Sequence, residues 1–132
     1  MKSGLFAKLV LDDTNIESIE EVDKAYLEKF ESLAHLSMNK TRLTSLNNLP
    51  AGLNMKRLDL GDNFLKGEDL KKLALYKDHL RVLKVGNNKI ASYDDLDVLK
   101  EFEHLTEVDF ESNPFAGGDA KEYREKIFEK LP

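Results

Sequence analysis

Carboxylates at alternate positions near the C-terminal end of the chain are the residues best placed to do chemistry. Glu107, Asp109 and Glu111 are separated by single apolar residues. In an extended strand, side chains two positions apart project from the same face, so these three acids would point the same way. Like charges held close together repel one another, and a cationic partner would relieve that repulsion. The spacing therefore predicts a surface that binds basic partners.

Polar residues alternate with apolar ones in four earlier segments as well. Cations and acids mix in the middle segments, which predicts a docking surface of mixed charge with acids at its C-terminal end. A second interpretation stays open, in which the same residues are merely exposed strand positions. The candidate partner-binding residues on this concave face are Asp12, His35, Asn39, Arg57, Asp59, Lys84, Glu107, Asp109 and Glu111.

The residue types needed for catalysis or metal binding do not form a constellation in this sequence. His35, His79 and His104 are the only histidines, and a lone histidine is a poor ligand set. Asp94 and Asp95 are adjacent, but they lie at an expected helix start, where acids stabilise the helix dipole. The sequence has no cysteine, which excludes disulfides, zinc–thiolate sites and a thiol nucleophile. We therefore expect a protein that is not an enzyme and holds no metal or cofactor.

Five copies of one short sequence pattern determine where the candidate partner-binding residues lie. The pattern is L-x-x-L-x-L-x-x-N-x-L, with clean copies beginning at Met55, Leu80 and Leu105 and copies beginning at Phe6 and Leu33 that carry threonine in place of asparagine. Its second apolar position recurs at 9, 36, 58, 83 and 108, a spacing typical of the leucine-rich repeat, whose period is about 20–29 residues. The sequence therefore predicts an α/β fold. We expect a leucine-rich repeat solenoid with a curved parallel sheet on the concave side and helices and turns on the convex side.

Asparagines that follow three of the expected strands are predicted to be structural. Asn63, Asn88 and Asn113 occupy the same place in successive repeats, where the chain turns away from the strand. An amide side chain has two donors and a carbonyl acceptor. Each asparagine can therefore satisfy backbone groups that the turn would otherwise leave unpaired in the core.

Helices are expected between most of the strands. The first has Val22, Tyr26 and Phe30 at steps of four, the spacing of one helix face. The expected helices span Ile19–Leu33, Gly67–His79 and Ser92–His104, whereas Thr44–Leu53 is expected to be mainly turn.

A C-terminal helix is predicted to close the end of the stack. A capping-box pattern begins at Asp119, and the helix is expected to run to Leu131. Tyr123, Ile127 and Leu131 recur at steps of four and should pack over the last repeat. With this cap, residues 1–132 are expected to form a single domain of about five repeats.

Charge is unevenly spread along the chain. The net charge is −5, but residues 40–90 carry 11 Lys and Arg against 5 Asp and Glu, a net charge of +6. One interpretation is solvated charge on outer helices, and the other is a bipolar surface that steers a charged partner. No apolar stretch approaches the roughly 18 residues of a membrane span. The absence of cysteine favours an intracellular location.

Several segments resemble one known family. They are Met55-Lys-Arg-Leu-Asp-Leu60, Gly86-Asn-Asn-Lys-Ile90 and an ending made of Glu122-Tyr-Arg-Glu125, Ile127-Phe128 and Leu131-Pro132. Over nearly its whole length the chain resembles the acidic leucine-rich nuclear phosphoprotein (32-kilodalton) family, whose relatives include the leucine-rich A-prime protein of the spliceosome. Members continue past this ending into a long acidic tail, so we expect the chain to be the folded half of such a protein.

The resemblance implies a non-catalytic module for protein–protein interaction. The partners that it implies are histones and the catalytic subunit of a serine/threonine phosphatase, which members inhibit. It also implies roles in chromatin regulation and nuclear transport, with the protein in nucleus and cytoplasm, and we expect a monomer. The alternative is a scaffold for spliceosomal or other ribonucleoprotein assembly, in which the +6 block would contact RNA phosphates.

Overall fold

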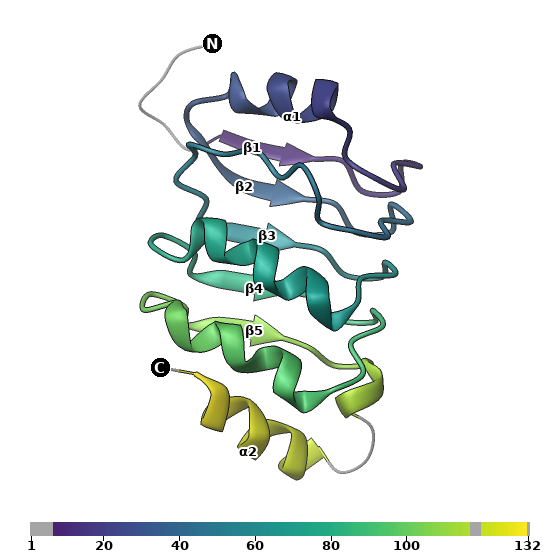
Figure 1. Ribbon diagram of the computed structural model, residues 1–132, viewed down its shortest axis with the longest axis vertical. Helices are drawn as coiled ribbons and strands as arrows, with labels where there is room; N and C mark the ends of the chain where they lie inside the picture. The colour runs from purple at the N-terminus through teal and green to yellow at the C-terminus, as the bar shows by residue number, and fades with distance from the viewer. Residues whose placement is uncertain (1–6, 117–119, 132) are drawn as a thin grey trace.

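Five parallel strands form one sheet in which they lie side by side in chain order (Figure 1). The computed structural model describes residues 7–116 and 120–131, so the roles expected for Phe6, Asp119 and Pro132 lie outside the described residues. The mixed α/β class and the predicted parallel sheet are confirmed. The strands are β1 (Ala7–Val10), β2 (Leu33–Ser37), β3 (Arg57–Asp59), β4 (Val82–Lys84) and β5 (Glu107–Asp109).

Strand register follows the spacing of the repeated pattern. The second apolar residue of each repeat pairs with its counterpart on the next strand. Because side chains alternate across a strand, this register puts the core residues on one face and the intervening polar residues on the other. The paired core residues are Leu9, Leu36, Leu58, Leu83 and Val108.

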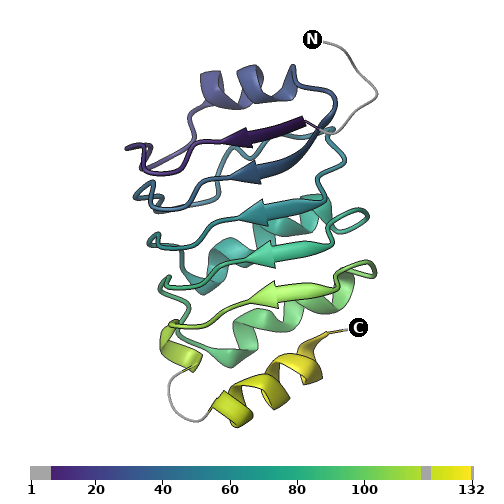
Figure 2. The same cartoon turned by 180° about the vertical axis from the view of Figure 1, so that it is seen from behind.

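Helical segments cover one face of the sheet and leave the other open. The 3₁₀ helices η1 (Gly67–Tyr76) and η2 (Tyr93–Glu101) lie over one face, whereas the view from behind in Figure 2 shows strands that no described helix covers. The helix α1 (Glu21–Glu28) lies at the β1 end, and α2 (Ala120–Lys130) lies beyond β5, after the short η3 (Pro114–Ala116). No helix in the described part of the chain is long and apolar enough to cross a membrane.

The long helices over the sheet are 3₁₀ helices. Leu70, Leu73 and Tyr76 recur at steps of three and are 0–2% exposed, which matches the three residues per turn of this helix. Adjacent strands lie about 4.8 Å apart, whereas packed α-helices need about 8–10 Å, so the narrower helix suits the spacing of the repeats. Both η1 and η2 end three residues before their predicted C-termini. The link Thr44–Leu53 contains no helix, in line with the predicted turn.

The first helix is shorter than predicted and turns a different face inward. Instead of filling Ile19–Leu33, α1 spans eight residues, and Leu33 begins β2. Val22 and Tyr26 are 75% and 59% exposed, while Leu27 is buried, so the predicted apolar face is wrong. β1 is the edge strand of the described sheet, so α1 packs against the sheet on one of its sides only. A hollow of about 510 Å³ lies between α1 and β1.

The three turn asparagines each bond two successive repeats. The amide nitrogen of Asn88 donates to the carbonyl oxygens of Leu60 and Val85, both at 3.0 Å, and its Oδ1 accepts the N–H of Leu65 at 3.0 Å. Asn63 and Asn113 make the equivalent bonds one repeat earlier and one repeat later. All three side chains are buried, at 2–3% exposure. This asparagine ladder satisfies backbone groups where β3, β4 and β5 end.

The C-terminal helix packs against the last repeat. Ile127 is 6% exposed and belongs to the core, while Tyr123 and the partly buried Leu131 pack against that core. The hydroxyl of Tyr123 accepts the N–H of Phe110 at 2.8 Å, at the end of β5. Burial raises the pKa of the Tyr123 hydroxyl above its usual value. Apolar burial and a bond to the backbone just after β5 therefore hold α2 against the last repeat.

Replacing Asn88 with alanine should lower the free energy of unfolding by about 1–3 kcal/mol, because buried backbone groups lose their partner. Denaturant unfolding measures the change. Asn54→Ala is the control, since Asn54 is exposed and lies outside the ladder. If the two variants unfolded at the same denaturant concentration, the ladder would not stabilise the fold.

Replacing Ile127 with alanine should cost about 2 kcal/mol, because it leaves a cavity between α2 and the last repeat. Its neighbour Phe128 is 75% exposed, so Phe128→Ala should change stability by no more than about 0.5 kcal/mol. Thermal and denaturant unfolding of both variants test the cap. Equal stability of the two would mean that α2 does not close the end of the core.

Candidate binding groove

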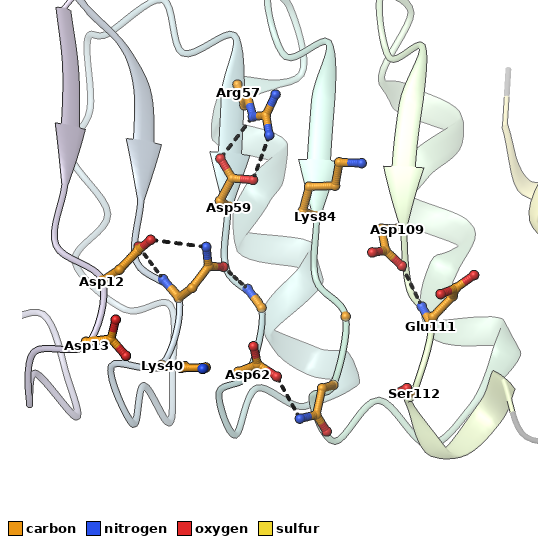
Figure 3. A pocket seen from close by; sticks show the side chains of 14 residues that line it. Asp12, Asp13, Lys40, Arg57, Asp59, Asp62, Lys84, Asp109, Glu111 and Ser112 are labelled. Carbon is orange, nitrogen blue, oxygen red and sulfur yellow. Dashed lines mark hydrogen bonds and ion pairs between the residues drawn. The ribbon is translucent and has the colours of Figure 1, made fainter.

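The open face of the sheet carries the polar residues that alternate with the core leucines. In register, Asp59 lies beside Lys84, and Lys84 lies beside Asp109. These side chains and the turns beyond them line an open hollow of about 550 Å³, called the groove below (Figure 3). His35 and Glu107 lie outside the lining: His35 contacts it through a hydrogen bond with Asp59, and Glu107 through an ion pair with Lys84. The predicted residues that line the groove are Asp12, Asn39, Arg57, Asp59, Lys84, Asp109 and Glu111.

Asp59 is the centre of a charge-paired cluster in the middle of the groove. Arg57 donates twice to its carboxylate, with Nε 2.9 Å from Oδ2 and Nη2 3.2 Å from Oδ1. Nε2 of His35 lies 2.5 Å from the same Oδ2. Burial alone would raise the pKa of Asp59, but the hydrogen bonds from Arg57 and His35 outweigh it and lower the pKa below its usual value. The charge of Asp59 is therefore already balanced within the protein.

Asp12 is held by donors from the neighbouring repeat. Its Oδ1 accepts the hydroxyl of Ser37 at 2.7 Å and the backbone N–H of Asn39 at 2.8 Å. Burial would raise the pKa of Asp12, and these hydrogen bonds outweigh it and lower the pKa. Oδ1 of Asn39 in turn accepts the N–H of Gly61 at 2.7 Å, so the chain of bonds links three successive repeats. Asp12 and Asn39 therefore line the groove and also hold its backbone in place.

The three acids on and after β5 are not equivalent. Nζ of Lys84 lies 2.5 Å from Oε2 of Glu107, and this hydrogen bond lowers the pKa of Glu107. The expected repulsion among three free acids is therefore wrong for Glu107, because β4 supplies a cation to it. Asp109 accepts the N–H of Glu111 at 2.9 Å through Oδ1. In the described part of the chain, Asp109 and Glu111 have no ion pair.

A row of turn residues that sequence reasoning missed forms the rim of the groove. Their φ angles lie between 52° and 63°, in the left-handed region that Asn and Asp tolerate best among residues other than glycine. Each directly precedes the threonine or asparagine of the repeated pattern, so this place in the pattern could have identified them. The row is Asp13, Lys40, Asp62, Asn87 and Ser112.

Acids without ion pairs lie at both ends of the groove and on its rim. Figure 3 shows Asp13 at the end formed by the first repeats and Asp109 with Glu111 at the other, with the paired cluster between them. Asp62 lies at the rim, where its Oδ1 accepts a hydrogen bond from the side-chain Nδ2 of Asn87 at 2.7 Å. The described residues hold no group of three His, Cys, Asp or Glu placed to bind a metal ion.

Replacing Asp59 with asparagine should lower the free energy of unfolding by about 1–2 kcal/mol at pH 5, because Arg57 and His35 lose a charged acceptor. The folded-state pKa is lowered, so this stabilisation is present above the unfolded value of about 3.9 and is lost as pH falls through the folded-state value. The gap between parent and variant in urea unfolding should therefore shrink from pH 5 to pH 3. A gap that stayed constant would show that the charge of Asp59 does not stabilise the fold.

Curated proteins resemble this chain, although no protein-family model matches it. An acidic leucine-rich nuclear phosphoprotein 32-related protein of Plasmodium falciparum is 33% identical over 126 residues, 95% of this chain and 44% of its own length. Acidic leucine-rich nuclear phosphoprotein 32 family member A of Drosophila melanogaster is 34% identical over 131 residues, 99% of this chain and 47% of its own length. A protein of Tetrahymena thermophila that is named a histone is 31% identical over 116 residues, 88% of this chain and 29% of its own length.

The likeness extends over almost all of the present sequence. The chain spans less than half the length of each of these relatives, so their remaining parts have no counterpart in the residues compared. Two of the three relatives carry the same family name, at 33% and 34% identity. These 132 residues therefore belong to the acidic leucine-rich nuclear phosphoprotein 32 family.

Proposed function

We propose that this chain is a leucine-rich repeat solenoid that docks basic protein segments in the groove and catalyses no reaction. The regular register of the five strands and the asparagine ladder support the solenoid. The observation that carries the function is the set of carboxylates without ion pairs at the two ends of the groove: Asp13 at one end, and Asp109 with Glu111 at the other.

The distance between the two acidic ends of the groove sets the length of the peptide segment that can contact both. Five strands about 4.8 Å apart place β1 and β5 about 19 Å from each other. An extended chain covers about 3.3 Å per residue, so about six residues would reach from one acidic end to the other. A segment with lysine or arginine near both of its ends matches this spacing. Between the two ends Asp59 is already paired, and the rim holds Lys40 and Asp62, one charge of each sign, so the middle of the segment needs no net charge.

Histone tails have this chemistry, since they are extended and rich in lysine and arginine. The names of two relatives describe nuclear phosphoproteins, and the Tetrahymena relative is itself named a histone, which supports histones as partners and a role in chromatin. From the family resemblance we also propose that the protein is located in the nucleus with a cytoplasmic pool and that it is a monomer. The resemblance also implies inhibition of a phosphatase catalytic subunit, but the acids of the groove favour the histone.

The alternative of a ribonucleoprotein scaffold finds no support in the groove. Arg57 and Lys84 already hold carboxylates, so among the described lining residues Lys40 is the one cation without an ion pair, and the acids without ion pairs outnumber it. A phosphate backbone would meet Asp62, Asp109 and Glu111 and would be repelled. The groove therefore favours a basic protein over RNA.

Neutralising the acids of the groove without changing their shape should weaken histone binding. The test variant is Asp13→Asn, Asp109→Asn and Glu111→Gln together, which neutralises the acids at both ends while the amide of residue 109 keeps the acceptor oxygen that bonds the turn. Titration of a labelled histone H3 tail peptide at 50 mM salt should give an affinity about tenfold lower than that of the parent. The difference should shrink at 300 mM salt, because exposed charges are screened.

A control variant with the same net charge separates position from overall electrostatics. Asp78→Asn, Glu103→Gln and Glu125→Gln remove three exposed acids that lie outside the groove. This control should bind within about twofold of the parent, because its charges do not line the groove and salt screens their longer-range effect. If the groove variant and the control bound the peptide equally well, the proposed docking site would be wrong.

A further inference from the structure

A second surface with charge opposite to that of the groove lies along the edge of the stack, just past the turns. Arg42, Phe64 and Lys89 directly follow the threonine or asparagine of three successive repeats. The N–H of Phe64 donates to the carbonyl oxygen of Leu43 at 2.9 Å, and a backbone bridge pairs Lys66 with Lys89. Three neighbouring repeats therefore bring these side chains together. This patch of Arg42, Phe64, Lys66 and Lys89 is called the cationic edge below.

The side chains of the cationic edge are open to solvent. Phe64 is 49% exposed, and Arg42, Lys66 and Lys89 are exposed as well. None of the three cations has an ion pair within the described residues, in contrast to Lys84 in the groove. Nζ of Lys89 lies 6.0 Å from the centre of the Phe64 ring, at the outer limit of a cation–π contact. The ring is therefore only loosely covered, and its face is accessible to a ligand.

An accessible aromatic ring among cations without ion pairs fits one class of ligand closely. Single-stranded nucleic acid binds through bases that stack on aromatic rings and phosphates that contact lysine and arginine. We propose that the cationic edge binds single-stranded nucleic acid, with a base on Phe64 and phosphates at Arg42, Lys66 and Lys89. Three repeats span about 10 Å, enough for a few nucleotides but narrow for a duplex.

This proposal is independent of the proposed function. The cationic edge shares no residue with the lining of the groove, in which acids outnumber cations, whereas the charged residues of the edge are all cations. An acidic peptide would also be attracted to the cations, but it would make no use of the exposed ring. The contribution of Phe64 therefore separates the two classes of ligand.

The test uses fluorescence anisotropy with a fluorescein-labelled 12-nucleotide oligouridine RNA at 20–200 mM salt. Phe64→Leu keeps an apolar side chain but removes the ring, and it should weaken binding about fivefold or more. Lys66→Gln with Lys89→Gln should weaken binding and reduce the slope of log affinity against log salt by about 1. Thermal unfolding of each variant verifies that the fold is kept.

Matched controls change the same residue types elsewhere. Phe128→Leu alters a ring that is 75% exposed on α2, and Lys71→Gln with Lys100→Gln removes two exposed cations from η1 and η2. Both should bind RNA within about twofold of the parent. The proposal is overturned if the parent does not bind RNA at 20 mM salt, or if Phe64→Leu binds as well as the parent. It is also overturned if a polyglutamate 12-mer binds as tightly as RNA and loses affinity only in the double lysine variant.

Discussion

Backbone groups at the end of each strand impose the constraint on which the other features of this protein depend. The chain must turn there while its N–H and C=O groups are still inside the core, and a buried group without a partner costs about 1–3 kcal/mol. After β3, β4 and β5 an asparagine amide meets this demand by bonding carbonyl oxygens of its own and the preceding repeat. After β1 and β2 the hydroxyls of Thr14 and Thr41 each donate to a carbonyl oxygen of their own repeat. The asparagine bonds hold successive strands in one register, so stability and the placement of surface residues have a common origin.

The turn also separates two surfaces of different charge. Asp62 directly precedes Asn63, has a φ of 56° and faces the groove, whereas Phe64 directly follows and lies on the cationic edge. The next turn repeats the arrangement, with Asn87 in the groove and Lys89 on the edge. A basic protein segment and a nucleic acid would therefore meet opposite sides of the same turns. Their binding would compete only through overall charge, which salt screens.

The sequence was most informative where its period matches a physical repeat. Strand positions, register and the face of each polar residue follow from the spacing of the leucines and from alternation along a strand. The 3₁₀ helices were not foreseen, because steps of three such as Leu70 and Leu73 also fit one face of an α-helix. The pairing of Glu107 with Lys84 was missed for a different reason. Lys84 stands opposite Asp109 in register, so this ion pair is a diagonal contact that depends on side-chain conformation.

Hydrogen exchange at three backbone amides tests the asparagine ladder most directly. The N–H groups of Leu43, Leu65 and Ile90 each donate to the asparagine side chain of the following repeat. If the ladder holds the strand ends, these amides should exchange only as fast as the whole protein unfolds, which nuclear magnetic resonance can measure residue by residue. Exchange at the rate of an open surface turn, such as the one at Asn47, would contradict the account.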